Sequence, residues 1–151
     1  QQLSVASAKA IFLRIKKLTP VFSPKQFLKI SNSNLKKTGL SRPKINYCNI
    51  LANEILSGEL SFRSLHKLDD DELKKRLCEI KGIGEWTAEC YMLASLRRKD
   101  IWPVKDLGLQ AAIKEIKNLD SRPGEEEMLA LAISWMPYRS IAANVLWASH
   151  D

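Results

Sequence analysis

The chain has 151 residues, a length that suits one compact domain or two small lobes sharing a core. Hydrophobic residues make up 45% of it, which excludes general disorder, and the formal net charge is +7. That charge favours a polyanionic partner, nucleic acid first and a membrane surface second, although an ordinary basic protein would have the same balance.

Apolar spacing predicts helices along almost the whole chain. The first is predicted over 1–18, where apolar residues recur every three or four positions and no capping residue comes before them. Ser23 and Pro24 mark the start of the next helix, and Gly39 closes a short turn after Leu35. No stretch alternates for long enough to be a strand, so we predict an all-α fold. The remaining helices are predicted over 41–58, 69–80, 85–97, 107–116, 123–136 and 137–150.

Two of these helices have a clear apolar side. The first helix is expected to place on one face Val5, Ala8, Ile11, Phe12 and Ile15. The helix over 123–136 begins with three glutamates, and it is expected to bury Met128, Leu131, Ile133 and Trp135.

The cysteines and the chain start indicate the setting of the protein. Cys48, Cys78 and Cys90 form no CxxC pair, which fits neither a disulfide framework nor a zinc site and indicates a reducing interior. No apolar run approaches the roughly 20 residues of a membrane span, and no signal peptide opens the chain. Because a helical pattern begins at once without an initiator Met, we expect a fragment whose first segment is missing.

Two glycines separate the helices predicted over 69–80 and 85–97. Glycine permits positive φ and close approach of the backbone, and Ile83 between Gly82 and Gly84 can pack into the groove between the helices. The amides of the turn and of the following helix would then point outward and form an anion site. A DNA phosphate is its natural ligand, bound without regard to base sequence. An ordinary tight turn would leave the same two glycines.

Asp106 stands where the helix predicted over 107–116 begins. Taken alone, it is an N-cap worth about 1 kcal/mol. It follows the glycine hairpin and one further helix, and this order of elements also fits a functional carboxylate, as the resemblance described next implies.

These segments resemble the helix-hairpin-helix (HhH-GPD) DNA glycosylase superfamily. The string Leu77-x-x-Ile80-Lys81-Gly82-Ile83-Gly84-x-x-Thr87-Ala88 resembles the hairpin of DNA repair proteins. The match is nearest to the alkylpurine branch, the 3-methyladenine DNA glycosylase II type, and it runs from Gln1 to about Ala148. The segments that carry it are 1–6, 39–44, 82–88, 137–140 and 146–147. Family members usually have a further N-terminal helical segment, and some have a β-rich domain.

The resemblance implies a fold and a reaction. It implies a two-lobed helical glycosylase core over 1–151, with the hairpin at about 69–97 and the catalytic Asp loop at about 100–107. Asp106 matches the family's catalytic carboxylate, which stabilises the oxocarbenium-like sugar or orients the attacking water while the N-glycosidic bond breaks. The implied activity is base-excision repair of alkylated purines of the 3-methyladenine and 7-methylguanine class.

Trp86 narrows the chemistry further. Relatives that also cut the strand have a lysine nucleophile two residues after the second hairpin glycine, and this chain has Trp86 there. Without that amine the usual Schiff-base route is closed, so we predict a monofunctional enzyme that leaves an abasic site. The four-cysteine iron–sulfur loop of some relatives is also missing, and no cofactor or metal is predicted. The sequence leaves open whether the hairpin carbonyls hold a monovalent cation, as those of some relatives do.

Aromatic side chains are candidates for the base pocket. Alkylated purines are cationic or electron-poor, and aromatic faces attract such rings by roughly 0.5–2 kcal/mol each. The predicted pocket residues are Trp86, Trp147, Tyr138 and Cys90, the last standing where some relatives have an aromatic. Tryptophans on apolar helix faces are more often core, and we assign Trp102 and Trp135 there.

The remaining predicted site residues contact DNA. Gln2 matches the position of the wedge that fills the gap left by a flipped base. Phosphate contacts are predicted for Lys81, Gly82, Ile83, Gly84, Thr87, Arg42, Lys44 and Arg139. Basic side chains on helices are usually only solvated, and Arg139 has the alternative of pairing with a carboxylate.

Two other functions fit part of the pattern. A non-catalytic helix-hairpin-helix module would share the hairpin and the charge, and a glycosylase for another damaged base would share the fold. An unrelated helical interaction domain would leave the paired glycines unexplained. The expected partner is double-stranded DNA with damaged bases, bound by a monomer with no membrane contact, in the cytoplasm (the nucleoid) or, in a eukaryote, the nucleus.

Overall fold

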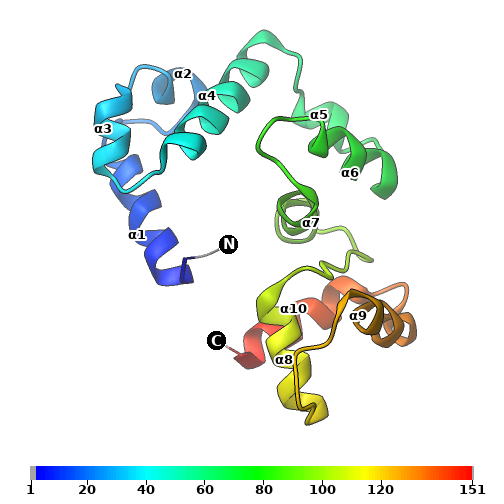
Figure 1. The fold of residues 1–151 in the computed structure, drawn as a ribbon. Coiled ribbons are helices and arrows are strands. Elements are labelled where there is room, and N and C mark those ends of the chain that lie inside the picture. Colours follow the sequence, from blue (N-terminus) through cyan, green and yellow to red (C-terminus); the bar gives the residue numbers. More distant parts are fainter. Residues whose placement is uncertain (1–2, 151) are drawn as a thin grey trace. The chain divides into compact units, whose positions relative to one another are not determined.

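The computed structural model describes residues 3–150, and this part of the chain is helical with no strand, as the apolar spacing predicts. The helices divide into two compact units (Figure 1). The first unit is residues 1–65 with 80–82, and the second is residues 66–79 with 83–151.

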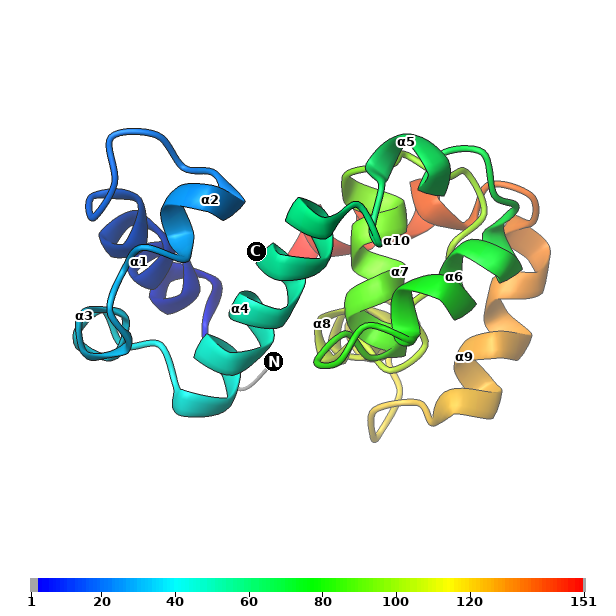
Figure 2. The same ribbon diagram turned by 90° about the horizontal axis from the view of Figure 1, so that it is seen from above.

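The first unit is built around one long helix. α4 packs against α2 and α3 (Figure 2), and its two buried side chains join a core of Ile15, Phe27, Leu35, Ile45 and Ala52. Arg14 ties α1 to the turn after α3, because its Nε donates to the carbonyl of Thr38 at 2.8 Å. The helices are α1 (Val5–Lys16), α2 (Pro24–Phe27), α3 (Asn32–Lys37), α4 (Arg42–Ser57) and α5 (Phe62–Leu65).

The start of the first helix differs from the prediction. α1 begins at Val5, and Ser4 caps it by accepting a hydrogen bond from the Ser7 amide at 3.2 Å, so the expected absence of a cap is wrong. Val5 is 78% exposed, and only Ile15 of the predicted face is fully buried. Phe12 is also exposed and meets Phe22 edge-on, with 5.5 Å between the ring centroids.

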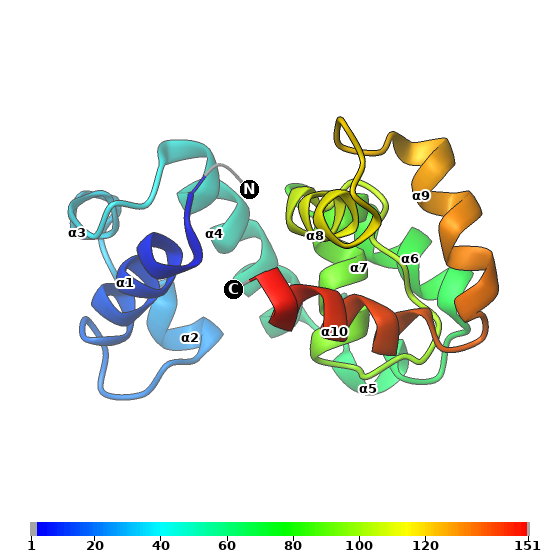
Figure 3. The same ribbon diagram turned by 90° about the horizontal axis from the view of Figure 1, so that it is seen from below.

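The second unit contains α6 (Asp70–Cys78), α7 (Glu85–Ala94), α8 (Leu107–Lys117), α9 (Glu125–Ala132) and α10 (Arg139–His150). α6 packs on α7, and α8 packs on α10 (Figure 3). The acids of the first turn and the Asp69 cap start α6 favourably, as the helix dipole requires. Its apolar side buries Leu73 and Leu77.

The segment predicted as one helix over 123–136 is divided. α9 ends at Ala132, and the 3-10 turn Ile133–Trp135 follows. Met128 is fully buried as predicted, whereas Ile133 is 68% exposed, which corrects its assignment to the core. Ile133 follows buried Ala132 directly, and successive helical residues point about 100° apart, so Ile133 lies off the face that α9 buries.

Two arginines fix the loop between α7 and α8. Arg98 donates to the carbonyls of His66 and Leu68 at 3.1 and 2.8 Å. Arg139 holds Asp100 with two guanidinium contacts, Nε to Oδ1 at 2.7 Å and Nη2 to Oδ2 at 2.9 Å. Its side-chain hydrogen bonds hold the pKa of the Asp100 carboxyl below the ordinary value. The predicted alternative for Arg139, pairing with a carboxylate, is therefore what the structure has.

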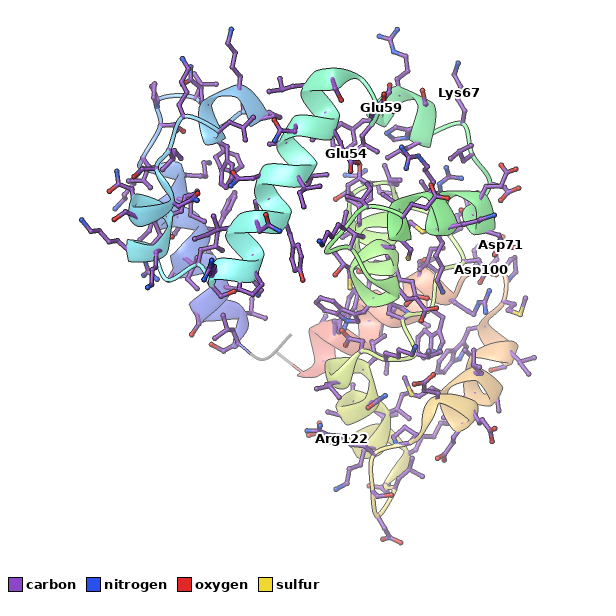
Figure 4. The ribbon with its side chains drawn as sticks, turned by 45° about the horizontal axis from the view of Figure 1, so that its top comes forward. Glu54, Glu59, Lys67, Asp71, Asp100 and Arg122 are labelled. Carbon is purple, nitrogen blue, oxygen red and sulfur yellow. The ribbon has the colours of Figure 1, made fainter. Side chains whose placement is uncertain are left out.

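We predict that Arg139→Gln lowers the free energy of unfolding at pH 7 by about 1–2 kcal/mol, between the worth of an exposed ion pair and of a hydrogen bond to a charged group. The lowered pKa of Asp100 means that this stabilisation is complete above the ordinary Asp value of about 3.9 and is lost as pH falls through the folded-state value. Urea unfolding at pH 7 and at about pH 2.5 measures both. Arg122→Gln, on the loop after α8 (Figure 4), is the control. An equal deficit at both pH values would contradict the assignment.

Candidate functional site

Asp106 is the centre of the site, and it begins α8. Its Oδ1 accepts a hydrogen bond from the Leu109 amide at 2.8 Å, so the predicted N-cap is confirmed. The residue is only 8% exposed. The segment before Asp106 includes the buried residues Ile101 and Trp102. Hydrogen bonds hold both: the Ser140 hydroxyl accepts from the Ile101 amide at 2.9 Å, and the Trp102 indole donates to the Met128 carbonyl at 3.0 Å. The loop therefore delivers the carboxylate in one fixed position.

Two tryptophans from other helices meet the same carboxylate. Trp86 of α7 donates its indole N–H to Oδ2 at 2.7 Å, and Trp147 of α10 donates to Oδ1 at 2.9 Å. They lie 20 and 41 residues from Asp106 along the chain. Helix packing within the second unit thus brings two predicted pocket residues to the predicted catalytic carboxylate.

Cys90 lies one turn after Trp86 on α7, on the same side. Burial raises the pKa of its thiol to about 12, with the negative charges of Asp106 and Glu89 adding to the effect. The group is therefore an uncharged, half-buried thiol at neutral pH. Its electrostatic contact with Asp106 supports its assignment to the same pocket.

Tyr138 stands apart from these residues. It precedes α10, whereas Trp147 is in the last turn of that helix, and a helix rises about 1.5 Å per residue. Its side chain is 54% exposed. The structure therefore does not bring Tyr138 together with the other predicted pocket residues. Trp102 is buried, as assigned from the sequence, and half-buried Trp135 packs against it with 5.2 Å between ring centroids.

The predicted hairpin leaves backbone exposed at the start of α7. Gly82 has φ +96°, and a Cβ there would overlap the ring of Tyr47, so both the conformation and the space require glycine. Gly84 is the N-cap of α7 and provides no side-chain cap, so the first-turn amides remain available to an anion. Ile80 is buried, and Ile83 is only half-buried.

An ion pair beside the hairpin was not evident from the sequence. Lys105, the neighbour of Asp106, contacts Glu85 of α7 with 2.7 Å between Nζ and Oε2. Its hydrogen bond with Glu85 raises the pKa of Lys105 and lowers that of Glu85. This amine is therefore charged and held by a carboxylate. The two residues are 20 positions apart in the sequence. No sequence rule links residues at that spacing.

A separate hollow of about 540 Å³ lies elsewhere in the second unit. Its lining includes Asp71 and Asp100, labelled in Figure 4, and Glu89, which is buried and paired with Lys74 at 2.6 Å between Nζ and Oε1. Neither Asp106 nor Trp86 lines it. Its acidic side chains disfavour a polyanion, so we do not assign it to the site.

The remaining predicted contacts lie in the first unit or outside the described residues. Arg42 and Lys44 are exposed at the start of α4, and Arg42 lines a hollow with Lys36 and Asn46. Gln2 lies outside the described residues. Within 3–150, no three His, Cys, Asp or Glu side chains gather as a metal site, and no helix has the length and apolar character needed to cross a membrane.

Comparisons with known proteins agree with this geometry. Residues 1–137 match the family described as "HhH-GPD superfamily base excision DNA repair protein". The chain is 34% identical over 83% of its length to a putative DNA-3-methyladenine glycosylase of Bacillus subtilis, covering 44% of that protein. It is 36% identical over 83% of its length to an alkylbase DNA glycosidase-like protein of Schizosaccharomyces pombe, covering 59% of that protein.

Solved structures agree as well. The S. pombe 3-methyladenine DNA glycosylase in complex with abasic DNA is 30% identical, with a TM-score of 0.92 over 97% of this chain and 73% of that one. The Bacillus halodurans DNA-3-methyladenine glycosidase is 34% identical, with a TM-score of 0.81 over 99% of this chain and 70% of that one.

The chain spans about half the length of the curated relatives named above. The match nevertheless covers most of the chain itself and includes the hairpin and Asp106. The chain belongs to the HhH-GPD superfamily of base excision DNA repair proteins.

Proposed function

We propose that this chain provides the catalytic core of a monofunctional DNA glycosylase that removes alkylated purines, such as 3-methyladenine and 7-methylguanine, from double-stranded DNA. The observation that carries the proposal is a nearly buried carboxylate, Asp106, held between the indoles of Trp86 and Trp147. The names of the relatives, which are 3-methyladenine and alkylbase glycosylases, support the same substrate class.

The reaction needs a negative charge beside the sugar. The target nucleotide leaves the base stack so that the enzyme can reach its glycosidic bond. As that bond breaks, the sugar gains oxocarbenium character, and a carboxylate fixed in advance stabilises this positive charge without reorganising. Asp106 supplies the carboxylate in this proposal, and water completes the hydrolysis.

The aromatic side chains suit a cationic base. An indole N–H lies in the plane of its ring, so donation to Asp106 from Trp86 and Trp147 leaves the ring faces available for stacking. Cys90 adds a small uncharged side chain next to them. We expect these three residues to form the wall of the base pocket.

Contacts with the DNA backbone come from the hairpin in this proposal. The open amides at the start of α7 and the side chain of Lys81 bind one phosphate, and Arg42 and Lys44 add contacts from the first unit. Gln2 is proposed as the wedge. The protein would act as a monomer on nucleoid or nuclear DNA.

We predict that Asp106→Asn lowers base excision by roughly 100-fold or more, the usual loss when one preorganised electrostatic group is removed. Asparagine keeps the N-cap through its one oxygen, but its amide N–H2 faces the Trp86 indole N–H, so the thermal midpoint should fall by a few degrees while DNA affinity stays within about twofold. A duplex with one 7-methylguanine, scored for abasic sites, measures the rate. Unchanged excision would remove Asp106 from the reaction, and absence of excision by the unmodified protein would favour the binding-module function.

We predict that the product strand stays intact until alkali or heat is added. Trp86 occupies the lyase position, and Lys105, which precedes Asp106, is held by Glu85, so neither position offers a free amine for a Schiff base. Borohydride added during turnover should trap no covalent protein–DNA complex, whereas a bifunctional glycosylase run in parallel should be trapped. A trapped complex would contradict the monofunctional assignment.

We predict that Lys81→Ala weakens binding equally for damaged and undamaged duplexes. One lost phosphate contact should reduce the slope of log affinity against log salt by about 0.9. Fluorescence anisotropy at several salt concentrations gives the slope. Lys67→Ala is the matched control, because it removes the same charge at the opposite end of α6 from the hairpin (Figure 4). Equal effects of the two substitutions would indicate general charge attraction and not a hairpin contact.

A further inference from the structure

The Asp106 carboxylate is surrounded by hydrogen-bond donors. Oδ1 accepts from the Leu109 amide at 2.8 Å and from the Trp147 indole at 2.9 Å, and Oδ2 accepts from the Trp86 indole at 2.7 Å. A carboxylate has about four lone-pair positions. Among the described residues, two donors therefore fill Oδ1, and one donor leaves a position open on Oδ2.

We propose that Trp86 and Trp147 are positioning residues that act through Asp106, in addition to any contact with the base. Their indole N–H groups fix the plane of the carboxylate and leave Oδ2 as the oxygen that faces the sugar or the attacking water. This inference rests on the glycosylase function proposed above, and it goes further by assigning the two indoles a task that an aromatic ring without N–H could not perform.

The local geometry supports a fixed carboxylate over a mobile one. The three donors come from three different helices, α7, α8 and α10, so no single helix movement can preserve all three bonds. The carboxylate is nearly buried, which excludes water as an easy replacement for a lost donor. Hydrogen bonds to a charged group are also stronger and shorter than neutral ones.

Gly108 provides the space that this arrangement needs. A Cβ built on Gly108 would lie 3.1 Å from Asp106 Oδ1 and 3.8 Å from Trp147 Nε1. The residue lies in the first turn of α8 with ordinary helical backbone, where alanine favours the helix more than glycine does. Gly108→Ala should therefore crowd the carboxylate without weakening the helix.

The test combines rates with a spectroscopic signal. The four tryptophans give four indole ¹⁵N–¹H signals, which single Trp→Phe variants assign. In Asp106→Asn, the signals of Trp86 and Trp147 should move, and those of Trp102 and Trp135 should stay, because Trp102 donates to Met128 instead. This readout does not depend on catalysis.

Single-turnover excision of 7-methylguanine then tests the role. Trp86→Phe and Trp147→Phe keep an aromatic ring and lose the N–H, so we expect the rate constant to fall roughly 10-fold or more while DNA affinity stays within about twofold. In the Asp106→Asn background the same substitutions should add no further loss, because their target is gone. Gly108→Ala should lose rate with an unchanged or higher thermal midpoint, and Trp135→Phe, the matched control, should keep the wild-type rate.

The possible outcomes separate the two proposals. Wild-type rates in the Phe variants, a loss that adds to that of Asp106→Asn, or a loss of DNA affinity in place of rate would overturn the positioning role and leave the glycosylase function intact. If the wild type releases no alkylated base while the two indole signals still respond to Asp106→Asn, the glycosylase function fails, and the tryptophans are structural partners of a helix cap.

Discussion

The second unit depends on one buried negative charge and the donors gathered around it. Removing the Asp106 carboxylate from water is costly unless its oxygens are hydrogen-bonded, and three N–H groups from three helices meet that requirement. The same hydrogen bonds fix the positions of α7, α8 and α10 relative to one another. In the proposed function, the catalytic carboxylate is also the group that joins these three helices, so helix packing would set the position of the carboxylate.

Polar side chains also hold the loop between α7 and α8, which ends at Asp106. Ser140 both accepts from and donates to the backbone of Ile101, with 2.9 and 3.3 Å between the atoms, and next to it Arg139 holds Asp100. Polar side chains at the start of α10 therefore set the path of the residues that end at Asp106. The loop between α7 and α8 has no helix or strand, and these polar contacts hold it together with the buried Ile101, Trp102 and Pro103.

Local rules predicted the parts of the structure that depend on near neighbours. The all-α class, the cap at Asp106 and the glycine requirement at Gly82 follow from spacing and backbone preference, and the structure confirms them. The carboxylate's bond to Trp147 could not be predicted in this way, because 41 residues separate the pair and only helix packing joins them. Ile133 shows a different failure, since an apolar run holds more apolar side chains than one helix face can bury, and Ile133 lies off the face of Met128 and Ala132.

The burial of Cys90 has a consequence for its reactivity toward electrophiles. Electrophiles that methylate DNA also attack thiolates, and a thiol whose pKa is about 12 is ionised in only about one molecule in 10⁵ at pH 7. Cys48 and Cys78 also have raised pKa values, in both cases chiefly through burial. Because the thiolate is the nucleophile, burial keeps the three thiols in the form that alkylating agents modify most slowly.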